Sequence, residues 1–172
     1  HAPTFLEMDP PQHTRYRRIM SSAFTPKGVG LIADRIEQRA AEIVERVVGR
    51  SGEFDFVREV SAKLPMLTIA DMLGVPDEQS EEFAPAGDNF ISAADPAVNL
   101  GRDPVAFAGE NMSRVMEIGL DLVSHRRKYP ADDIASALAA HRIDGKYLPD
   151  DEIGAMVVLL CVAGNDTTKQ TT

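Results

Sequence analysis

The chain has 172 residues, a length suited to one domain, and its 44% hydrophobic and 26% charged residues indicate a soluble globular protein. A formal net charge of −9 argues against general nucleic-acid binding, and the single cysteine excludes an internal disulfide and fits a reducing cytoplasm. The longest apolar run, residues 155–164, is shorter than the about 20 residues that cross a bilayer, so we expect no membrane segment. No charged-then-apolar leader is visible, and we expect a cytoplasmic protein.

The amino-terminal part predicts an extended segment followed by a helix. Residues 1–8 should be extended, because prolines disfavour a helix in the residues before them. Asp9 is a good N-cap and Pro10-Pro11 suit the first helical positions, so the helix should run to about Phe24.

His13 and Arg17 lie four residues apart and therefore on one face of this helix. Both side chains can donate hydrogen bonds to a carboxylate, and arginine can do so in two parallel bonds. On a helix that stood alone, the same pair would simply be a solvated basic face.

Amphipathic helices without visible chemistry follow. Thr25 caps a helix that should reach residue 48, and a second core-facing helix over residues 60–73 is closed by Gly74. Asp77 should cap a third helix that continues to about residue 94.

The next part of the chain predicts a loop between two helices. The residues Pro85-Ala86-Gly87 should interrupt the helix that begins at Asp77. Residues 95–104 are rich in turn formers, and a long helix should then run from Pro104 to about Tyr129. A short helix over residues 132–141 comes next, before a tight hairpin around Asp144-Gly145.

The last predicted helix begins at Asp150 and is apolar on all faces as far as Ala163, so we expect it to be central. Gly164, Asn165, Asp166, Thr167 and Thr168 come next, and all of these are poor helix formers. One interpretation is a functional site inside a central helix, where local preference and buried setting disagree. The alternative is that the helix ends at Gly164 as a C-cap.

The segment Ala163-Gly164-Asn165-Asp166-Thr167-Thr168 resembles the oxygen-activation motif of cytochrome P450 haem-thiolate monooxygenases. The segment Met8-Asp9-Pro10-Pro11-Gln12-His13-Thr14-Arg15-Tyr16-Arg17-Arg18, followed by Ala23-Phe24-Thr25-Pro26, resembles the bacterial members of the same family. The two segments occur in the expected order and at a plausible separation. The resemblance covers the whole chain but only the middle of a full-length member.

This resemblance implies a mainly α fold that is part of the cytochrome P450 fold, helices C to I, with at most a small β-hairpin. Residues 1–172 would form a single incomplete domain that lacks the amino-terminal sheet region and the carboxy-terminal haem-ligand half. The cofactor would be haem b, iron protoporphyrin IX. The resemblance assigns a haem propionate to His13 and Arg17.

The resemblance places the haem against Ala163 and Gly164 and gives Asp166 and Thr167 the catalytic roles. Thr167 would hold the outer oxygen atom of dioxygen, and Asp166 would relay protons from solvent. The implied reaction is hydroxylation of a small apolar organic substrate by dioxygen, with electrons from a ferredoxin or flavoprotein. Arg15 and Arg18 are either ordinary surface charge or part of a docking surface for that acidic donor.

The family's iron ligand is a cysteine beyond this central helix, and no such residue occurs in the chain, so we predict no metal ligand here. Cys161 lies inside the helix, where a small buried hydrophobe is the expected role. The four histidines have no metal-ligand spacing. We therefore expect an inactive fragment. The alternative from a different class is a non-catalytic helical interaction module.

Overall fold

The computed structural model describes residues 4–21 and 23–169, except for the side chains of Asp166, Thr167 and Lys169. In chain order the elements are η1 (Phe5–Glu7), α1 (Gln12–Ser21), α2 (Pro26–Gly30), α3 (Ala33–Val48), η2 (Val57–Ser61), α4 (Lys63–Leu73), α5 (Asp77–Ile91), α6 (Pro96–Asn99), α7 (Pro104–Arg126), α8 (Ile134–Ala140), β1 (Arg142–Ile143), β2 (Lys146–Tyr147) and α9 (Asp150–Lys169). The mainly α class and the small hairpin are confirmed.

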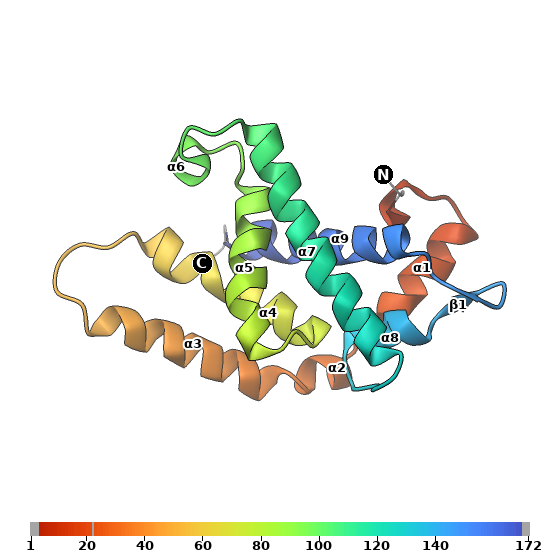
Figure 1. Cartoon of the computed structure of the whole chain (residues 1–172). Helices are drawn as coiled ribbons and strands as arrows, with labels where there is room; N and C mark the ends of the chain where they lie inside the picture. The colour runs from red at the N-terminus through yellow and green to blue at the C-terminus, as the bar shows by residue number, and fades with distance from the viewer. Residues whose placement is uncertain (1–3, 22, 170–172) are drawn as a thin grey trace.

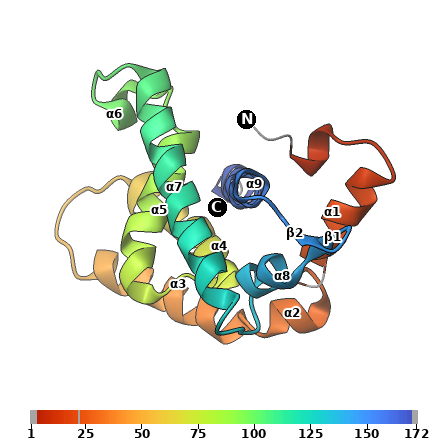
Figure 2. The same ribbon diagram turned by 45° about the vertical axis from the view of Figure 1, so that its right-hand side comes forward.

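Helix α9 runs through the middle of the molecule, and α4, α5 and α7 pack against it (Figures 1 and 2). Helices α1 and α8 lie near the end where α9 begins, and α3 runs along the outer side of α4. The buried side of α9 carries apolar residues at helical spacing: Ile153, Met156, Val157, Leu160 and Cys161. Burial of these side chains explains why α9 is central.

The backbones of α7 and α9 approach closely where α7 has a glycine. A Cβ atom added at Gly119 would lie 2.9 Å from both methyl groups of Val157, a residue with no exposed surface. A side chain larger than hydrogen does not fit at this crossing without movement of one helix.

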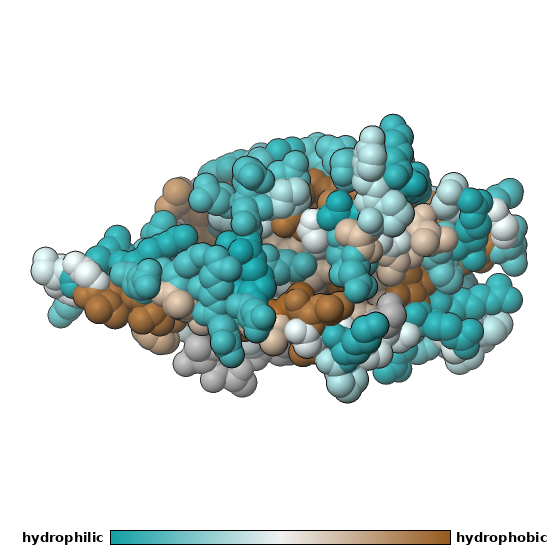
Figure 3. Space-filling model, turned by 90° about the horizontal axis from the view of Figure 1, so that it is seen from below, coloured by the Kyte–Doolittle hydropathy of each residue, from teal (hydrophilic) through white to brown (hydrophobic). Residues whose placement is uncertain are grey.

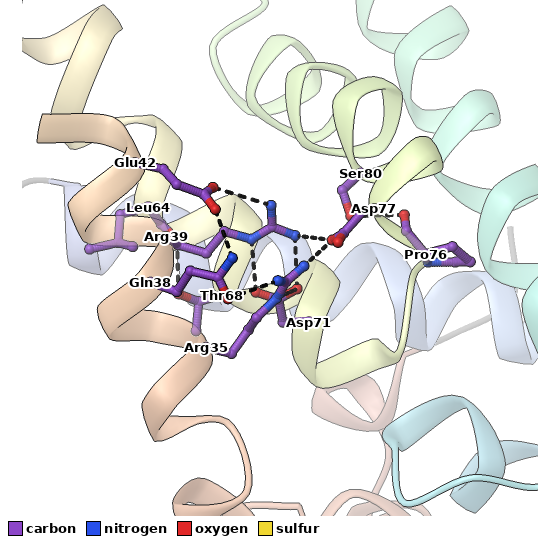
Figure 4. A network of polar contacts seen from close by, with 10 residues as sticks. All are labelled: Arg35, Gln38, Arg39, Glu42, Leu64, Thr68, Asp71, Pro76, Asp77 and Ser80. Carbon is purple, nitrogen blue, oxygen red and sulfur yellow. Dashed lines mark hydrogen bonds and ion pairs between the residues drawn. The ribbon is translucent and has the colours of Figure 1, made fainter. Parts of the chain in front are cut away.

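Two arginines of α3 tie this helix to α4 and α5 (Figure 4). The guanidinium of Arg39 donates to Asp71 at 3.1 and 3.2 Å and to Asp77 at 2.6 Å, and Arg35 donates to the same two carboxylates. The hydrogen bond to Asp71 is the main reason why the pKa of Arg39 is raised. Since only 10% of the Arg39 side chain and 7% of the Asp71 side chain are exposed, this is a buried ion pair.

Several predicted helix boundaries were wrong in the first third of the chain. Helix α1 begins at Gln12 rather than beside Asp9, because Pro11 disfavours the helical conformation for Pro10. Residues 5–7 form a 3-10 turn instead of an extended segment, with the Glu7 carboxylate accepting from the backbone of Thr4 at 2.8 Å. The helix capped by Thr25 breaks into α2 and α3.

Other differences lie in the middle of the chain. Pro85 does not interrupt α5. Proline has no N–H group, so the carbonyl group of Glu81, four residues earlier, loses its helical hydrogen bond. Both residues are exposed, and water can replace this bond. Asp77 is the first residue of α5, and Pro76 is its N-cap. The predicted loop over residues 95–104 contains the short helix α6.

Three local predictions are confirmed. Thr25 caps α2, Gly74 ends α4 in the left-handed conformation, and the chain turns at Asp144-Gly145.

Part of the surface is apolar. Val48, Phe54 and Phe56 are 76%, 41% and 51% exposed, and brown atoms gather at the left end of the face in Figure 3, where α3 leads into the connection to η2. Contiguous exposed apolar surface commonly marks contact with another part of a protein. Within the described residues, no helix combines the length and the apolar character that crossing a membrane requires.

Candidate functional site

Helix α9 continues through Gly164 to Lys169, so the alternative of a C-cap at Gly164 was wrong. A Cβ atom at Gly164 would collide with the end of the Ile69 side chain on α4, lying 2.7 Å from Cγ1. The missing side chain therefore lets α4 pack closely against α9. Tertiary contact of this kind outweighs the weak helix preference of glycine.

Asn165 follows Gly164 and is completely buried. Its Nδ2 donates a 3.1 Å hydrogen bond to Oδ1 of Asp88 on α5, while its own Oδ1 has no hydrogen-bond partner within the described part of the chain. The turn that begins at Gly164 is thus held by α4 on one side and by α5 on another.

The opposite face of these last turns is open. Val162 is 40% exposed and Ala163 is exposed, although most of α9 is buried. Position 167 lies one helical turn after Ala163 and therefore on the same face. The side chains of Asp166 and Thr167 lie outside the described part of the structure, and only their helical backbone is placed.

His13 and Arg17 both lie on α1, as predicted, one turn apart. His13 is half-buried, with its ring edge against Phe5 at a centroid distance of 5.9 Å. Arg17 is exposed, and in the described residues no carboxylate lies within ion-pairing distance of its guanidinium. Both side chains are thus available as donors to an external anion.

Tyr16 holds α1 against α9. Its buried hydroxyl donates a 2.6 Å hydrogen bond to Oε2 of Glu152 in the first turn of α9. Burial is the first reason why the pKa of Tyr16 is raised to about 12, and the Glu152 carboxylate is the second. Ala163 lies eleven residues after Glu152, about 16 Å along the helix axis. The structure does not bring His13 or Arg17 into contact with Ala163 or Gly164.

Cys161 is 1% exposed, and burial raises its pKa to about 12, so it remains a thiol at neutral pH. Its sulfur lies 3.8 Å from the position of a Cβ atom at Gly87. Since metal ligation requires the thiolate, Cys161 is a packing residue. In the described residues, no group of three or more histidine, cysteine or acidic side chains could hold a metal ion.

A basic pocket of about 250 Å³ lies between α1 and the hairpin. It is lined by Arg15, Arg18, His141 and Arg142, with Asp144 3.9 Å from Arg15. Sequence reasoning identified Arg15 and Arg18 but missed the hairpin residues, because only the fold places residues 141–144 beside α1. The hydrogen bonds of Asn165 and of Tyr16 with Glu152 could not be predicted either, because the two partners of each bond are far apart in the sequence.

The chain is similar over nearly its whole length to monooxygenases. It is 40% identical over 164 residues to the steroid C26-monooxygenase of Mycobacterium bovis, and the match covers 95% of this chain and 36% of that protein. Cytochrome P450 107B1 of Saccharopolyspora erythraea is 35% identical over 166 residues, which are 96% of this chain and 38% of that protein. No family model matches the chain.

Solved structures agree with these relatives. Cytochrome P450 CYP268A2 of Mycobacterium marinum, in complex with pseudoionone, has a TM-score of 0.88 and 43% identity over 98% of this chain and 41% of that one. CYP109E1 of Bacillus megaterium, in complex with testosterone, has a TM-score of 0.80 and 29% identity over 98% of this chain and 44% of that one. The predicted partial fold is therefore confirmed. The chain spans less than half the length of each of these relatives.

Proposed function

Because this chain belongs to the cytochrome P450 family, we propose that it supplies the oxygen-activating part of a haem-dependent monooxygenase. The observation that carries the proposal is the open apolar face at Val162 and Ala163 on a helix that is otherwise largely buried. The next turn of the same face contains position 167, where a hydroxyl group follows an acidic residue. We propose that residues 1–172 are part of one larger domain.

The residues present fit a haem. A porphyrin is flat and apolar in its centre and carries two propionates, so it requires an apolar wall and nearby cationic or N–H donors. The exposed methyl of Ala163 and the backbone at Gly164 offer the wall, with the side-chain position of Gly164 directed toward Ile69 instead. His13 and Arg17 offer the donors for a propionate, and Arg17 can bind it in two parallel hydrogen bonds.

When bound, haem supplies the binding and reduction of dioxygen and the insertion of one oxygen atom into a C–H bond. For one oxygen atom of dioxygen to leave as water, the protein would have to bring two protons to that outer atom, because one proton on each atom would give hydrogen peroxide instead. In the proposed mechanism, Thr167 Oγ1 holds that atom and a water molecule by hydrogen bonds. The carboxyl group of Asp166 passes protons from solvent to this water.

We propose an apolar organic substrate. The support comes from the relatives, one of which is named a steroid C26-monooxygenase, and from structures solved with testosterone and pseudoionone. Half-buried apolar residues on α5 and α7, the helices that pack against α9, suit such a ligand: Phe90, Met112 and Met116. Steroids and pseudoionone are the first compounds to test.

The electron donor in this proposal is an acidic ferredoxin or flavoprotein. The basic pocket of Arg15, Arg18, His141 and Arg142 is positive on a chain with a net charge of −9. An acidic protein would be steered to this region, and its association would weaken as salt increases. An electron-transfer rate that is independent of ionic strength would exclude this docking surface.

The test of the proposed function is the amount of product formed per dioxygen consumed by the haem-loaded whole protein. Thr167→Ala should lower this ratio severalfold, with hydrogen peroxide accounting for the missing oxygen, and Asp166→Asn should slow turnover. Thr168→Ala is the matched control, because it removes the same hydroxyl group about 100° further around the helix. An unchanged ratio in Thr167→Ala, together with unchanged turnover in Asp166→Asn, would refute the proposal.

A further inference from the structure

Asn165 is a buried amide at the crossing of α5 and α9. It has no exposed surface, and its Nδ2 donates a 3.1 Å hydrogen bond to Asp88. Its Oδ1 is buried as well and accepts no hydrogen bond from any described residue. A buried acceptor without a partner destabilises a fold and offsets part of what the bond to Asp88 contributes, so the amide adds little net stability here. A polar residue at such a position indicates a role other than stability.

Gly87, the residue before Asp88 on α5, packs against α4 and α9. A Cβ atom at Gly87 would collide with the end of the Met66 side chain and would lie 3.8 Å from the sulfur of Cys161. The absence of a side chain at Gly87 therefore lets the α5 backbone come close to Met66 of α4, while Cys161 of α9 lies at an ordinary contact distance. The next residue, Asp88, then presents its carboxylate to Asn165.

Two neighbouring contacts fix the rotation of α9 about its own axis. Gly164 packs against Ile69 of α4, and Asn165 is bonded to Asp88 of α5. Successive residues of a helix are about 100° apart, so these contacts hold α9 from two directions. They come immediately before positions 166 and 167. The direction in which those two positions face thus depends on both contacts.

We propose that Asn165 is a positioning residue, which sets the orientation of Asp166 and Thr167 through its hydrogen bond to Asp88. This inference rests on the proposed function of that turn. The bond also ties the orientation of the turn to α5. The Oδ1 atom, which has no partner among the described residues, is the structural cost of placing an amide at this crossing.

The test compares single variants of the haem-loaded whole protein. Asn165→Leu keeps the side-chain size and removes both the bond to Asp88 and the unpaired acceptor. We expect a melting temperature within a few degrees of the original, because the loss of the bond to Asp88 and the removal of the buried acceptor offset each other. We also expect product per dioxygen to fall at least threefold and amide hydrogen exchange in residues 163–169 to become about tenfold faster.

Asn89→Leu is the matched control. Asn89 follows Asp88 on α5, and its Nδ2 lies 3.4 Å from Oδ1 of Asn111 on α7. The control therefore removes a neighbouring amide that does not bond α9. Product per dioxygen and the exchange rates of residues 163–169 should stay at their original values.

A double variant separates this bond from general packing. If Asp88 and Asn165 act through one bond, Asp88→Ala combined with Asn165→Leu is no worse than the poorer single variant. Additive losses, or an Asn165→Leu protein with original exchange rates and product ratio, would overturn the inference. A lowered melting temperature with the original product ratio would overturn it too. Because hydrogen exchange does not depend on turnover, this readout remains decisive even if Thr167→Ala refutes the proposed function.

Discussion

The hydroxyl of Tyr16 donates a 2.6 Å hydrogen bond to Glu152, which joins the middle of α1 to the first turn of α9. The two residues are 136 positions apart in the sequence. His13 and Arg17 flank Tyr16 on the same helix, so this bond fixes where both donors lie relative to α9. Tyr16 thus links the proposed propionate-binding residues to the proposed oxygen-activating helix.

Loss of this bond should lower stability in a pH-dependent way. Tyr16→Phe should lower the free energy of unfolding at neutral pH by about 1–2 kcal/mol, because it removes a hydrogen bond to a charged group. The folded-state pKa is raised to about 12 from 10, so the unfolded chain loses its proton first as pH rises. The stabilisation is therefore complete below pH 10 and lost between pH 10 and 12.

The measurement is denaturant unfolding of the original protein and of Tyr16→Phe from pH 8 to 11.5. The difference between the two proteins should shrink as the pH rises above 10. Glu152→Gln keeps an acceptor for the hydroxyl and should be less damaging than Tyr16→Phe at neutral pH. A difference that does not depend on pH would show that the hydroxyl contributes nothing through ionisation.

The buried ion pair between α3 and α4 should be sensitive to the loss of one partner. Asp71→Ala removes the carboxylate that Arg39 and Arg35 share, and Arg39 is 9% exposed. We expect a loss toward the lower end of about 3–5 kcal/mol in the free energy of unfolding, because the buried Arg39 and its neighbour Arg35 would then share only the more exposed carboxylate of Asp77. Arg114→Ala is the control, since it breaks an exposed pair with Glu82 and should have a much smaller effect. Similar losses in both variants would contradict this account.

The α7–α9 crossing should not accept a methyl group. Gly119→Ala places a Cβ atom 2.9 Å from Val157 and should lower the free energy of unfolding by about 1–3 kcal/mol. Gly109→Ala on the same helix meets no atom within 4 Å and should raise it by up to about 1 kcal/mol. Adding Val157→Ala to Gly119→Ala should recover part of the loss. Equal effects of the two glycine substitutions would contradict the proposed close contact.

Arg17 should retain the haem. In the haem-loaded whole protein, Arg17→Gln should speed the loss of haem to an excess of apomyoglobin about tenfold or more, since a charge-assisted hydrogen bond contributes about 1.5–3 kcal/mol. Arg18→Gln removes an equal charge one residue further around α1 and should change the rate little. Equal acceleration in both variants would indicate a general effect of charge rather than a contact with a propionate.

Much of the fold follows from the sequence, because apolar periodicity, caps and turn residues act locally. The cap at Thr25, the end of α4 at Gly74 and the hairpin at Asp144-Gly145 are examples. The continuation of α9 through Gly164 could not be predicted in the same way, because the contact with Ile69 of α4 decides it. Solvent exposure decided the outcome at Pro85, which lies on the outer face of α5.

The candidate site, too, could be predicted from the sequence only in part. Resemblance to the family predicts His13, Arg17, Ala163 and Gly164 as site residues, and the structure has the first two on α1, half-buried and exposed respectively, and Ala163 on an open face. The bonds of Asn165 to Asp88 and of Tyr16 to Glu152 join residues 77 and 136 positions apart. No local pattern in the chain predicts such pairs.

The most direct test is an experimental structure of the haem-loaded whole protein. We predict that the porphyrin lies against the open face of α9, in contact with Ala163 and with the backbone at Gly164. One propionate should then lie within hydrogen-bonding distance of His13 and Arg17. A porphyrin bound elsewhere, or bound at Ala163 with both propionates directed away from α1, would contradict the account.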